Sequence, residues 1–147
     1  MNRLAFACFV VGMVTFAGLD PAMGAQKKGA RPAPLPGVQV LRDLEYVQGG
    51  HERNRLDLFL PEKAPGPLPV ILFVHGGGWQ RGDKTNTPAR LFATKGYAVA
   101  AINYRFSQHA TFPAQIQDCK AAVRWLRANA KKYGLDVDHI GAWGGSA

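Results

Sequence analysis

The sequence has few cysteines, and this scarcity argues against a disulfide framework. Its 147 residues contain Cys8 and Cys119 only, and Cys8 falls in an N-terminal segment that we expect to be removed. One thiol then remains in the mature chain, so no internal disulfide is expected. Cys119 falls on the apolar side of a predicted helix, and we interpret it as a small buried hydrophobic residue. Neither a metal site nor a cofactor is expected.

Acidic residues are also scarce, with 10 Asp and Glu against 18 Lys and Arg, which gives a net charge of +8. Such a balance can indicate a nucleic-acid partner. The basic excess, however, falls near the mature N-terminus and along one predicted helix, without the interleaved aromatic residues that stack on bases. We therefore expect no nucleic-acid partner and interpret the helical stripe as a solvated face. Its members are Lys120, Arg124, Arg127 and Lys131.

Residues 1–25 have the three-part pattern of a secretory signal peptide. Arg3 supplies the positive start, residues 4–19 form the apolar part, and residues 22–25 form a small-residue cleavage site with the cut expected after Gly24. The apolar run of about 16 residues is shorter than the roughly 20 that a spanning helix needs. The sequence therefore predicts export, to the periplasm or the outside, and no stable membrane anchor after cleavage.

The remaining chain divides into a short linker and one predicted domain. Residues 26–39 are rich in Pro, Gly and Lys and are predicted to be linker, and the domain is predicted over 40–147. Alternating apolar residues predict a hairpin with strands at 40–47 and 56–60, joined through a glycine turn. Proline-rich residues 61–69 are predicted to form a loop.

The continuous apolar run 70–74 is typical of a parallel strand buried on both faces, and residues 97–104 are predicted to be the next buried strand. Between them, Thr87-Pro88 predicts the start of a helix that ends at Lys95 before Gly96. A second helix is predicted over 114–132, followed by a turn at 136–138 and a last strand at 139–143. Its predicted apolar stripe is Ile116, Cys119, Val123, Leu126, Ala130 and Tyr133. Strand, helix and strand in alternation predict an α/β fold.

Two of the predicted buried strands lead into glycine motifs. The last seven residues, Gly141-Ala142-Trp143-Gly144-Gly145-Ser146-Ala147, match four-fifths of a G-x-S-x-G nucleophile elbow. A serine on a sharp strand-to-helix turn needs very small neighbours, because the turn must close while the hydroxyl stays accessible. The strand at 70–74 leads into His75-Gly76-Gly77-Gly78-Trp79. A phosphate-binding loop is the competing interpretation, but the glycine spacing fits neither common phosphate motif.

Together, these motifs resemble the α/β-hydrolase superfamily. Within it, the chain is most similar to the hormone-sensitive-lipase-like carboxylesterases and the secreted feruloyl and acetyl-xylan esterases. Further matching segments are Gly82–Lys84, Gly96–Val99, Asn103–Arg105, Phe112–Asp118 and Ala122–Leu126. The resemblance runs from about residue 40 to the end. It implies the N-terminal half of an α/β-hydrolase fold: a β-hairpin, then strand, loop, helix, strand, helix and strand, ending at the elbow.

The resemblance also implies a serine hydrolase that cleaves carboxylic esters through an acyl-enzyme on Ser146. The ester would belong to a small molecule or to a polysaccharide. The backbone N–H groups of Gly76, Gly77 and Ala147 would form the oxyanion hole. The residues implied to support the loop are His75, Gly78 and Trp79.

In the superfamily, the catalytic acid and histidine follow the serine in chain order, whereas all four histidines here precede Ser146. We therefore expect an N-terminal piece of a longer domain, inactive by itself. A same-fold exopeptidase, an arylformamidase and a non-catalytic binding module remain alternatives. The other chemically capable residues are interpreted as surface or turn histidines (His51, His109, His139), a helix-start acid (Asp118) and a turn former (Asp83).

Overall fold

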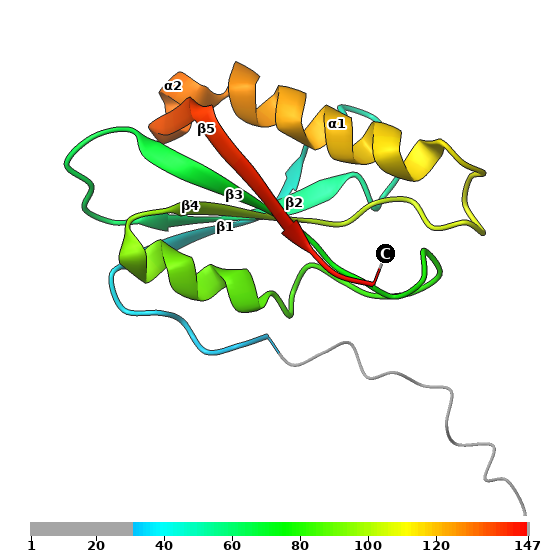
Figure 1. Cartoon of the computed structure of the whole chain (residues 1–147), viewed down its shortest axis with the longest axis horizontal. Coiled ribbons are helices and arrows are strands. Elements are labelled where there is room, and N and C mark those ends of the chain that lie inside the picture. Colours follow the sequence, from blue (N-terminus) through cyan, green and yellow to red (C-terminus); the bar gives the residue numbers. More distant parts are fainter. Residues whose placement is uncertain (1–30, 147) are drawn as a thin grey trace, which may run out of the picture.

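The computed structural model describes residues 31–146, which form a five-stranded sheet with helices on both faces (Figure 1). The strands are β1 (Val38–Glu45), β2 (Arg55–Pro61), β3 (Leu68–Val74), β4 (Ala98–Ile102) and β5 (Leu135–Gly144). The helices are η1 (Pro88–Lys95), α1 (Ala114–Ala128) and α2 (Ala130–Tyr133). In Figure 1, α1 and α2 cover one face and η1 covers the other. The expected signal peptide, the linker residues 26–30 and Ala147 lie outside the described residues.

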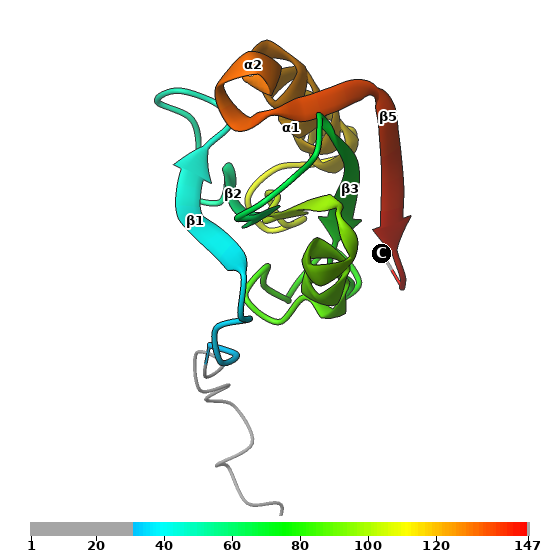
Figure 2. The same ribbon diagram turned by 90° about the vertical axis from the view of Figure 1, so that its left-hand side faces the viewer.

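The strand order across the sheet is β1-β2-β4-β3-β5. The pairs β1–β2 and β2–β4 are antiparallel, whereas β3 is parallel to both β4 and β5. Figure 2 shows β1 and β5 at opposite edges of the sheet. Because β3, β4 and β5 run in the same direction, their carboxyl ends lie together at one end of the strands. The start of β2 lies at the same end, since β2 runs antiparallel to β4. Open α/β sheets bind ligands at this end.

The predicted hairpin is confirmed, because β1 and β2 pair from Val38 opposite Pro61 to Glu45 opposite Arg55. β1 begins two residues before the expected domain boundary at residue 40. The loop after the hairpin is also shorter than expected. Leu68 already pairs with Leu135, so only residues 62–67 connect β2 to β3.

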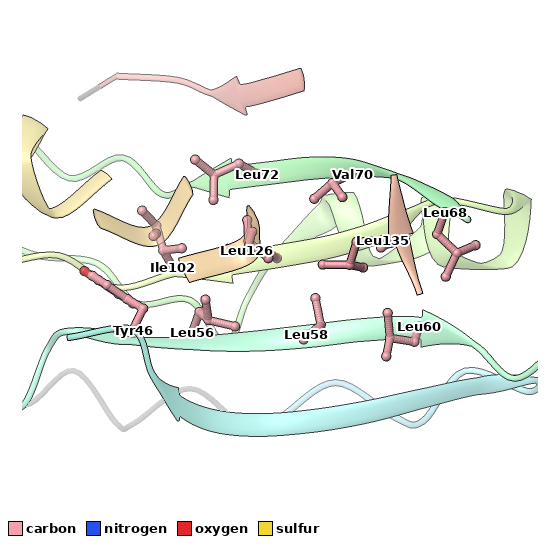
Figure 3. Packing of buried hydrophobic residues seen from close by; sticks show 13 residues of the cluster. Tyr46, Leu56, Leu58, Leu60, Leu68, Val70, Leu72, Ile102, Leu126 and Leu135 are labelled. Carbon is pink, nitrogen blue, oxygen red and sulfur yellow. The ribbon is translucent and has the colours of Figure 1, made fainter. Parts of the chain in front are cut away.

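The core follows from the alternation in β2 and β3. Leu56, Leu58 and Leu60 point from β2 toward the face that α1 covers, where they meet Val70, Leu72, Leu126 and Leu135 (Figure 3). A smaller cluster on the opposite face joins Phe59 and Phe73 to two buried alanines of η1. Each fully buried leucine contributes about 1.5–3 kcal/mol, so both helix layers are held by apolar packing.

The first predicted helix forms, but as a 3-10 helix. Thr87 occupies the expected N-cap position in an extended conformation, yet its side chain makes no capping hydrogen bond. Its hydroxyl is buried without a hydrogen-bond partner among the described residues. Gly96 ends the helix with a φ of 88°, as its position predicted. This short helix packs on the sheet through Ala89 and Ala93.

The second predicted helix is divided at Asn129 into α1 and α2. The Asn129 side chain donates to the Trp125 carbonyl at 2.9 Å, and such local bonds compete with the helix. The predicted apolar stripe is wrong at its start, because Ile116 is 44% exposed. The helix instead buries Gln115 and Asp118, whose polar atoms bond to the preceding loop.

Two local predictions at the ends of α1 and β5 are corrected. Asp118 does not act as a helix-start acid, because the first turn of α1 contains no acid and Asp118 is buried against Arg105. Residues 136–138 do not form a separate turn. They lie within β5, whose pairing jumps from Asp136 opposite Pro69 to Ile140 opposite Val70, so the segment bulges out of the ladder.

Within residues 31–146, no helix has both the length and the apolar character needed to cross a membrane.

Candidate active site

Ser146 stands immediately beyond the end of β5 in a backbone conformation that few side chains adopt. Its φ is 56°, in the left-handed region. A non-glycine residue held there costs on the order of 1–3 kcal/mol and persists only where the surroundings impose it. A nucleophile elbow requires a strained strand-to-turn backbone of this kind.

The glycine loop that follows β3 lies directly against this turn. A Cβ atom on Gly76 would collide with the carbonyl oxygen of Gly145 and lie 3.3 Å from the Ser146 Cβ. The Gly78 N–H donates to the Ser146 carbonyl at 3.4 Å. Figure 1 shows the red end of β5 beside the green loop. The fold therefore brings the two predicted glycine motifs into contact.

Gly77 gives the loop its shape. Its φ of 126° is rarely adopted by L-residues, and a Cβ there would collide with the Arg81 carbonyl. The Gly77 carbonyl accepts bonds from Gln80 N at 3.1 Å and Arg81 N at 3.2 Å, which close the turn. Within residues 31–146, the N–H groups of Gly76 and Gly77 donate to no other residue. Two amides beside the serine are thus left as donors.

His75 is buried beneath the loop with both ring nitrogens engaged. Its Nδ1 lies 2.8 Å from the Gly76 carbonyl, and its Nε2 lies 3.3 Å from Arg53 Nη2. The ring stacks on Tyr104, whose hydroxyl donates to the His75 carbonyl at 2.9 Å. Burial lowers the pKa of His75 below its usual 6.5, which favours the neutral imidazole. A ring held in this way has no free nitrogen to act as a base.

Trp79 contacts the loop's surroundings through its main chain. The indole is 50% exposed, while the Trp79 carbonyl accepts a bond from Ser107 N at 2.8 Å. Beside it, the Gln108 side chain donates to the Gln80 carbonyl at 3.0 Å. The segment after β4 therefore contacts the glycine loop at Trp79 and Gln80.

The remaining histidines have partners of their own. His51 and His109 face each other with ring centroids 4.6 Å apart, and His109 Nδ1 accepts a bond from Phe106 N. His139 lies at the bulge of β5, exposed and 2.7 Å from Asp136. Cys119 is partly buried, and burial raises the pKa of its thiol to about 11, so it is a poor nucleophile. Residues 31–146 hold no cluster of three or more potential metal ligands from His, Cys, Asp and Glu.

A buried polar network next to the loop had no predicted role. Lys84 Nζ donates to Asp57 at 2.5 Å and to Asp43 at 2.7 Å, and its main-chain N donates to the Asn103 side chain at 2.8 Å. Asn103 in turn donates to Asp83 at 2.9 Å, which fixes the segment that leaves the loop. Lys84 and Asn103 both fall in segments that matched the superfamily, and that match was the available signal.

Comparison with known proteins identifies the family. The sequence profile of the BD-FAE family matches residues 56–147, which include both glycine motifs.

The chain belongs to the BD-FAE family.

Relatives of this BD-FAE chain are esterases. A probable carboxylic ester hydrolase, LipM, from Mycobacterium tuberculosis (strain ATCC 25618 / H37Rv) is 36% identical, over 86% of this chain and 31% of LipM. A truncated form of a carbohydrate esterase from gut microbiota is 33% identical with a TM-score of 0.66, covering 72% of this chain and 39% of that one. Esterase B from Lactobacillus rhamnosis, solved with a tributyrin phosphonate inhibitor, is 33% identical with a TM-score of 0.68, covering 74% and 36%.

These matches confirm the predicted α/β-hydrolase fold and the resemblance to its esterase group. The BD-FAE chain spans about a quarter to a third of the length of the curated relatives it matches.

Proposed function

We propose that the complete protein containing this sequence is a serine hydrolase that cleaves carboxylic esters, with Ser146 as the nucleophile. One observation carries the proposal: Ser146 is held in the left-handed region at the end of β5, against a glycine loop that has unpaired amides. The esterase names of the relatives support the same reaction class.

In the proposed reaction, Ser146 Oγ attacks the ester carbonyl carbon and passes its proton to a histidine. The carbonyl oxygen becomes negative and accepts hydrogen bonds from the N–H groups of Gly76 and Gly77. The Ala147 N–H, outside the described residues, is the third proposed donor. The C–O bond then breaks as the histidine returns the proton to the leaving oxygen, so that a neutral alcohol departs. Water then attacks the acyl-enzyme, which releases the acid and restores the Ser146 hydroxyl.

The histidine and its acid partner are proposed to follow Ser146 in the complete protein, as in the superfamily. Three observations within the described residues support this proposal. His75 has both ring nitrogens engaged, and His51 and His109 pack on each other. His139 pairs with Asp136 at the bulge of β5, away from the carboxyl end where Ser146 stands.

The proposed substrate is an ester of a small molecule or an ester carried by a polysaccharide. The solved carbohydrate esterase favours a polysaccharide ester, and the tributyrin phosphonate bound to esterase B favours a small-molecule ester. Comparing the turnover of p-nitrophenyl acetate with that of acetylated xylan distinguishes the two substrate classes. Amide and formamide substrates, measured in parallel, test the exopeptidase and arylformamidase alternatives.

Labelling with a fluorophosphonate tests the nucleophile. The complete protein should be labelled, and Ser146→Ala should lose both the label and nearly all turnover, since removing such a serine can lower kcat by about a millionfold. Ser107 is the only other serine in the chain, so Ser107→Ala is the matched control and should keep the label. Comparable ester turnover by Ser146→Ala would overturn the assignment.

Export is proposed as well, on the signal-peptide pattern of residues 1–25 alone. Mass spectrometry of the protein recovered from outside the cytoplasm tests this export. The mature chain is expected to start at Ala25. A full-length chain retained in the cytoplasm would contradict export.

A further inference from the structure

Arg53 lies in the short segment between β1 and β2, at the sheet edge that carries the proposed site. The start of β2, directly after this segment, is bonded to the end of β4, because Asn103 N donates to the Arg55 carbonyl at 2.9 Å. The Arg53 main-chain N donates to His51 Nδ1 at 3.1 Å, which fixes the start of the side chain. The guanidinium is thereby directed under the glycine loop from an element outside it.

One guanidinium contacts both ends of that loop. Arg53 Nη2 lies 3.3 Å from His75 Nε2, at the residue where the loop begins. The same nitrogen donates at 3.1 Å to the carbonyl of Gly82, where the loop ends. Arg53 Nε donates at 2.8 Å to the carbonyl of Tyr104, beyond the end of β4. The loop of residues 75–82 is thus held at both of its ends by one guanidinium group.

These bonds determine which nitrogen of His75 carries the proton. The partner of Nδ1 is a carbonyl oxygen, which only accepts, so Nδ1 is the donor. Nε2 then presents a lone pair, and the always-protonated guanidinium is a suitable donor to it. The neutral ring holds the Gly76 carbonyl, and the Gly76–Gly77 peptide unit is therefore oriented through His75 by Arg53.

Arginine suits this position in a way that lysine does not. The planar fork supplies donors in two directions, toward Tyr104 and toward the loop, whereas an ammonium is a single point. The Arg53 Cζ atom also lies 3.6 Å from the centroid of Phe106, where the flat guanidinium stacks on the ring. The position therefore uses the shape of the group as well as its charge.

We infer that Arg53 is a positioning residue for ester hydrolysis. By holding both ends of the glycine loop and the tautomer of His75, it keeps the N–H groups of Gly76 and Gly77 aimed at the developing oxyanion. The inference rests on the proposed function. Because Arg53 acts through the loop, its removal should lower kcat more than it raises KM, and a displacement of about 1 Å can lower the rate roughly a hundredfold.

The experiment compares Arg53→Ala, Arg53→Lys and Arg55→Ala in the complete protein. Arg55 lies two residues away and pairs at the surface with Glu45, so it is the matched control and should keep wild-type kcat. Arg53→Ala should lose about a hundredfold in kcat for p-nitrophenyl acetate with KM changed by less than about threefold. Arg53→Lys should also lose kcat, by at least about tenfold, since its ammonium cannot reach both sides.

Ethylguanidinium added to Arg53→Ala should restore part of the lost kcat, a response that a merely destabilised protein does not give. If Arg53→Ala fails to fold, the Arg53→Lys variant decides. Kinetics like those of Arg55→Ala, a KM rise at constant kcat, or a rate loss that only follows the unfolded fraction would each overturn the inference. A wild-type protein that neither turns over esters nor takes the fluorophosphonate at Ser146 would overturn the proposed function itself.

Discussion

Ser146 and Gly76 restrict one another at the scale of single residues. The serine keeps a φ of 56°, and the close approach of Gly145 leaves no room for a Cβ on Gly76. A side chain on Gly76 would push the loop away from the turn that carries Ser146. The need for glycine at position 76 is therefore explained by a contact between two segments that are far apart in sequence.

Gly77→Val tests the loop as a source of oxyanion donors. We expect kcat to fall by about 10²–10³, the usual effect of losing one such donor, because valine opposes both the φ of 126° and the nearby Arg81 carbonyl. Steady-state ester kinetics provide the measurement. Gly66→Val is the control, since a Cβ at Gly66 would meet open space. Unchanged kcat with altered KM would show a binding loop instead.

At this scale, the sequence predicted residues whose role depends on their immediate neighbours. The glycines and Ser146 stand in short motifs whose spacing carries the chemistry. Arg53 and Lys84 were missed because their partners come from β1, β2, the loop and the segment after β4, and no local periodicity records such contacts. Only the superfamily-like segment at Gly82–Lys84 marked one of them.

At the scale of elements, α1 is tied to the site by an ion pair. Asp118, which is buried, accepts from the main chain and the guanidinium of Arg105, in the segment that leaves β4. The same segment continues to Ser107, which braces the glycine loop. A helix on the sheet face is thereby coupled to the position of the loop.

Asp118→Ala should destabilise the complete protein by about 3 kcal/mol, near the lower end for breaking a buried pair, because Arg105 is partly exposed and regains water. Urea unfolding measures the change. Lys120→Ala, on the exposed face of the same helix, should change stability by no more than about 0.5 kcal/mol. Equal stability of the two variants would contradict the anchoring role.

The strands were predictable because period-two alternation and β-branched runs report burial directly, as in β2 and β3. The α1–α2 break and the bulge of β5 were not, because each depends on a specific contact. Asn129 bonds back to Trp125, and the residues after Asp136 shift to reach the register of Ile140. The buried face of α1 was predicted wrongly at the start of the helix. There, the salt bridge between Asp118 and Arg105, rather than an apolar stripe, determines which face turns toward the core.

At the scale of the whole molecule, β5 is an edge of the described sheet and its outer side is unpaired there. On this edge strand, the Trp143 side chain is 41% exposed, and its ring packs edge-to-face against the rings of Phe92 and Phe73. Exposed apolar strand edges promote association between chains.

Residues 26–147 produced alone should therefore be poorly soluble or dye-binding, and should not hydrolyse p-nitrophenyl acetate above the Ser146→Ala background. The unpaired edge accounts for the first expectation, and the engaged nitrogens of His75 for the second. Light scattering, dye fluorescence and the ester assay provide the measurements. A soluble, cooperatively melting and ester-cleaving fragment would show that one of the upstream histidines serves as the base.

The order in which the chain is synthesised gives the Arg53 contacts a further consequence. Arg53, His75, Gly82 and Tyr104 all precede Ser146 in the sequence, and α1 separates Tyr104 from β5. Chains grow at about 5–20 residues per second and their N-terminal parts begin to fold first. The loop can thus acquire its bonds to Arg53 seconds before the serine leaves the ribosome. Ser146 is therefore synthesised after every residue that binds the ends of the loop.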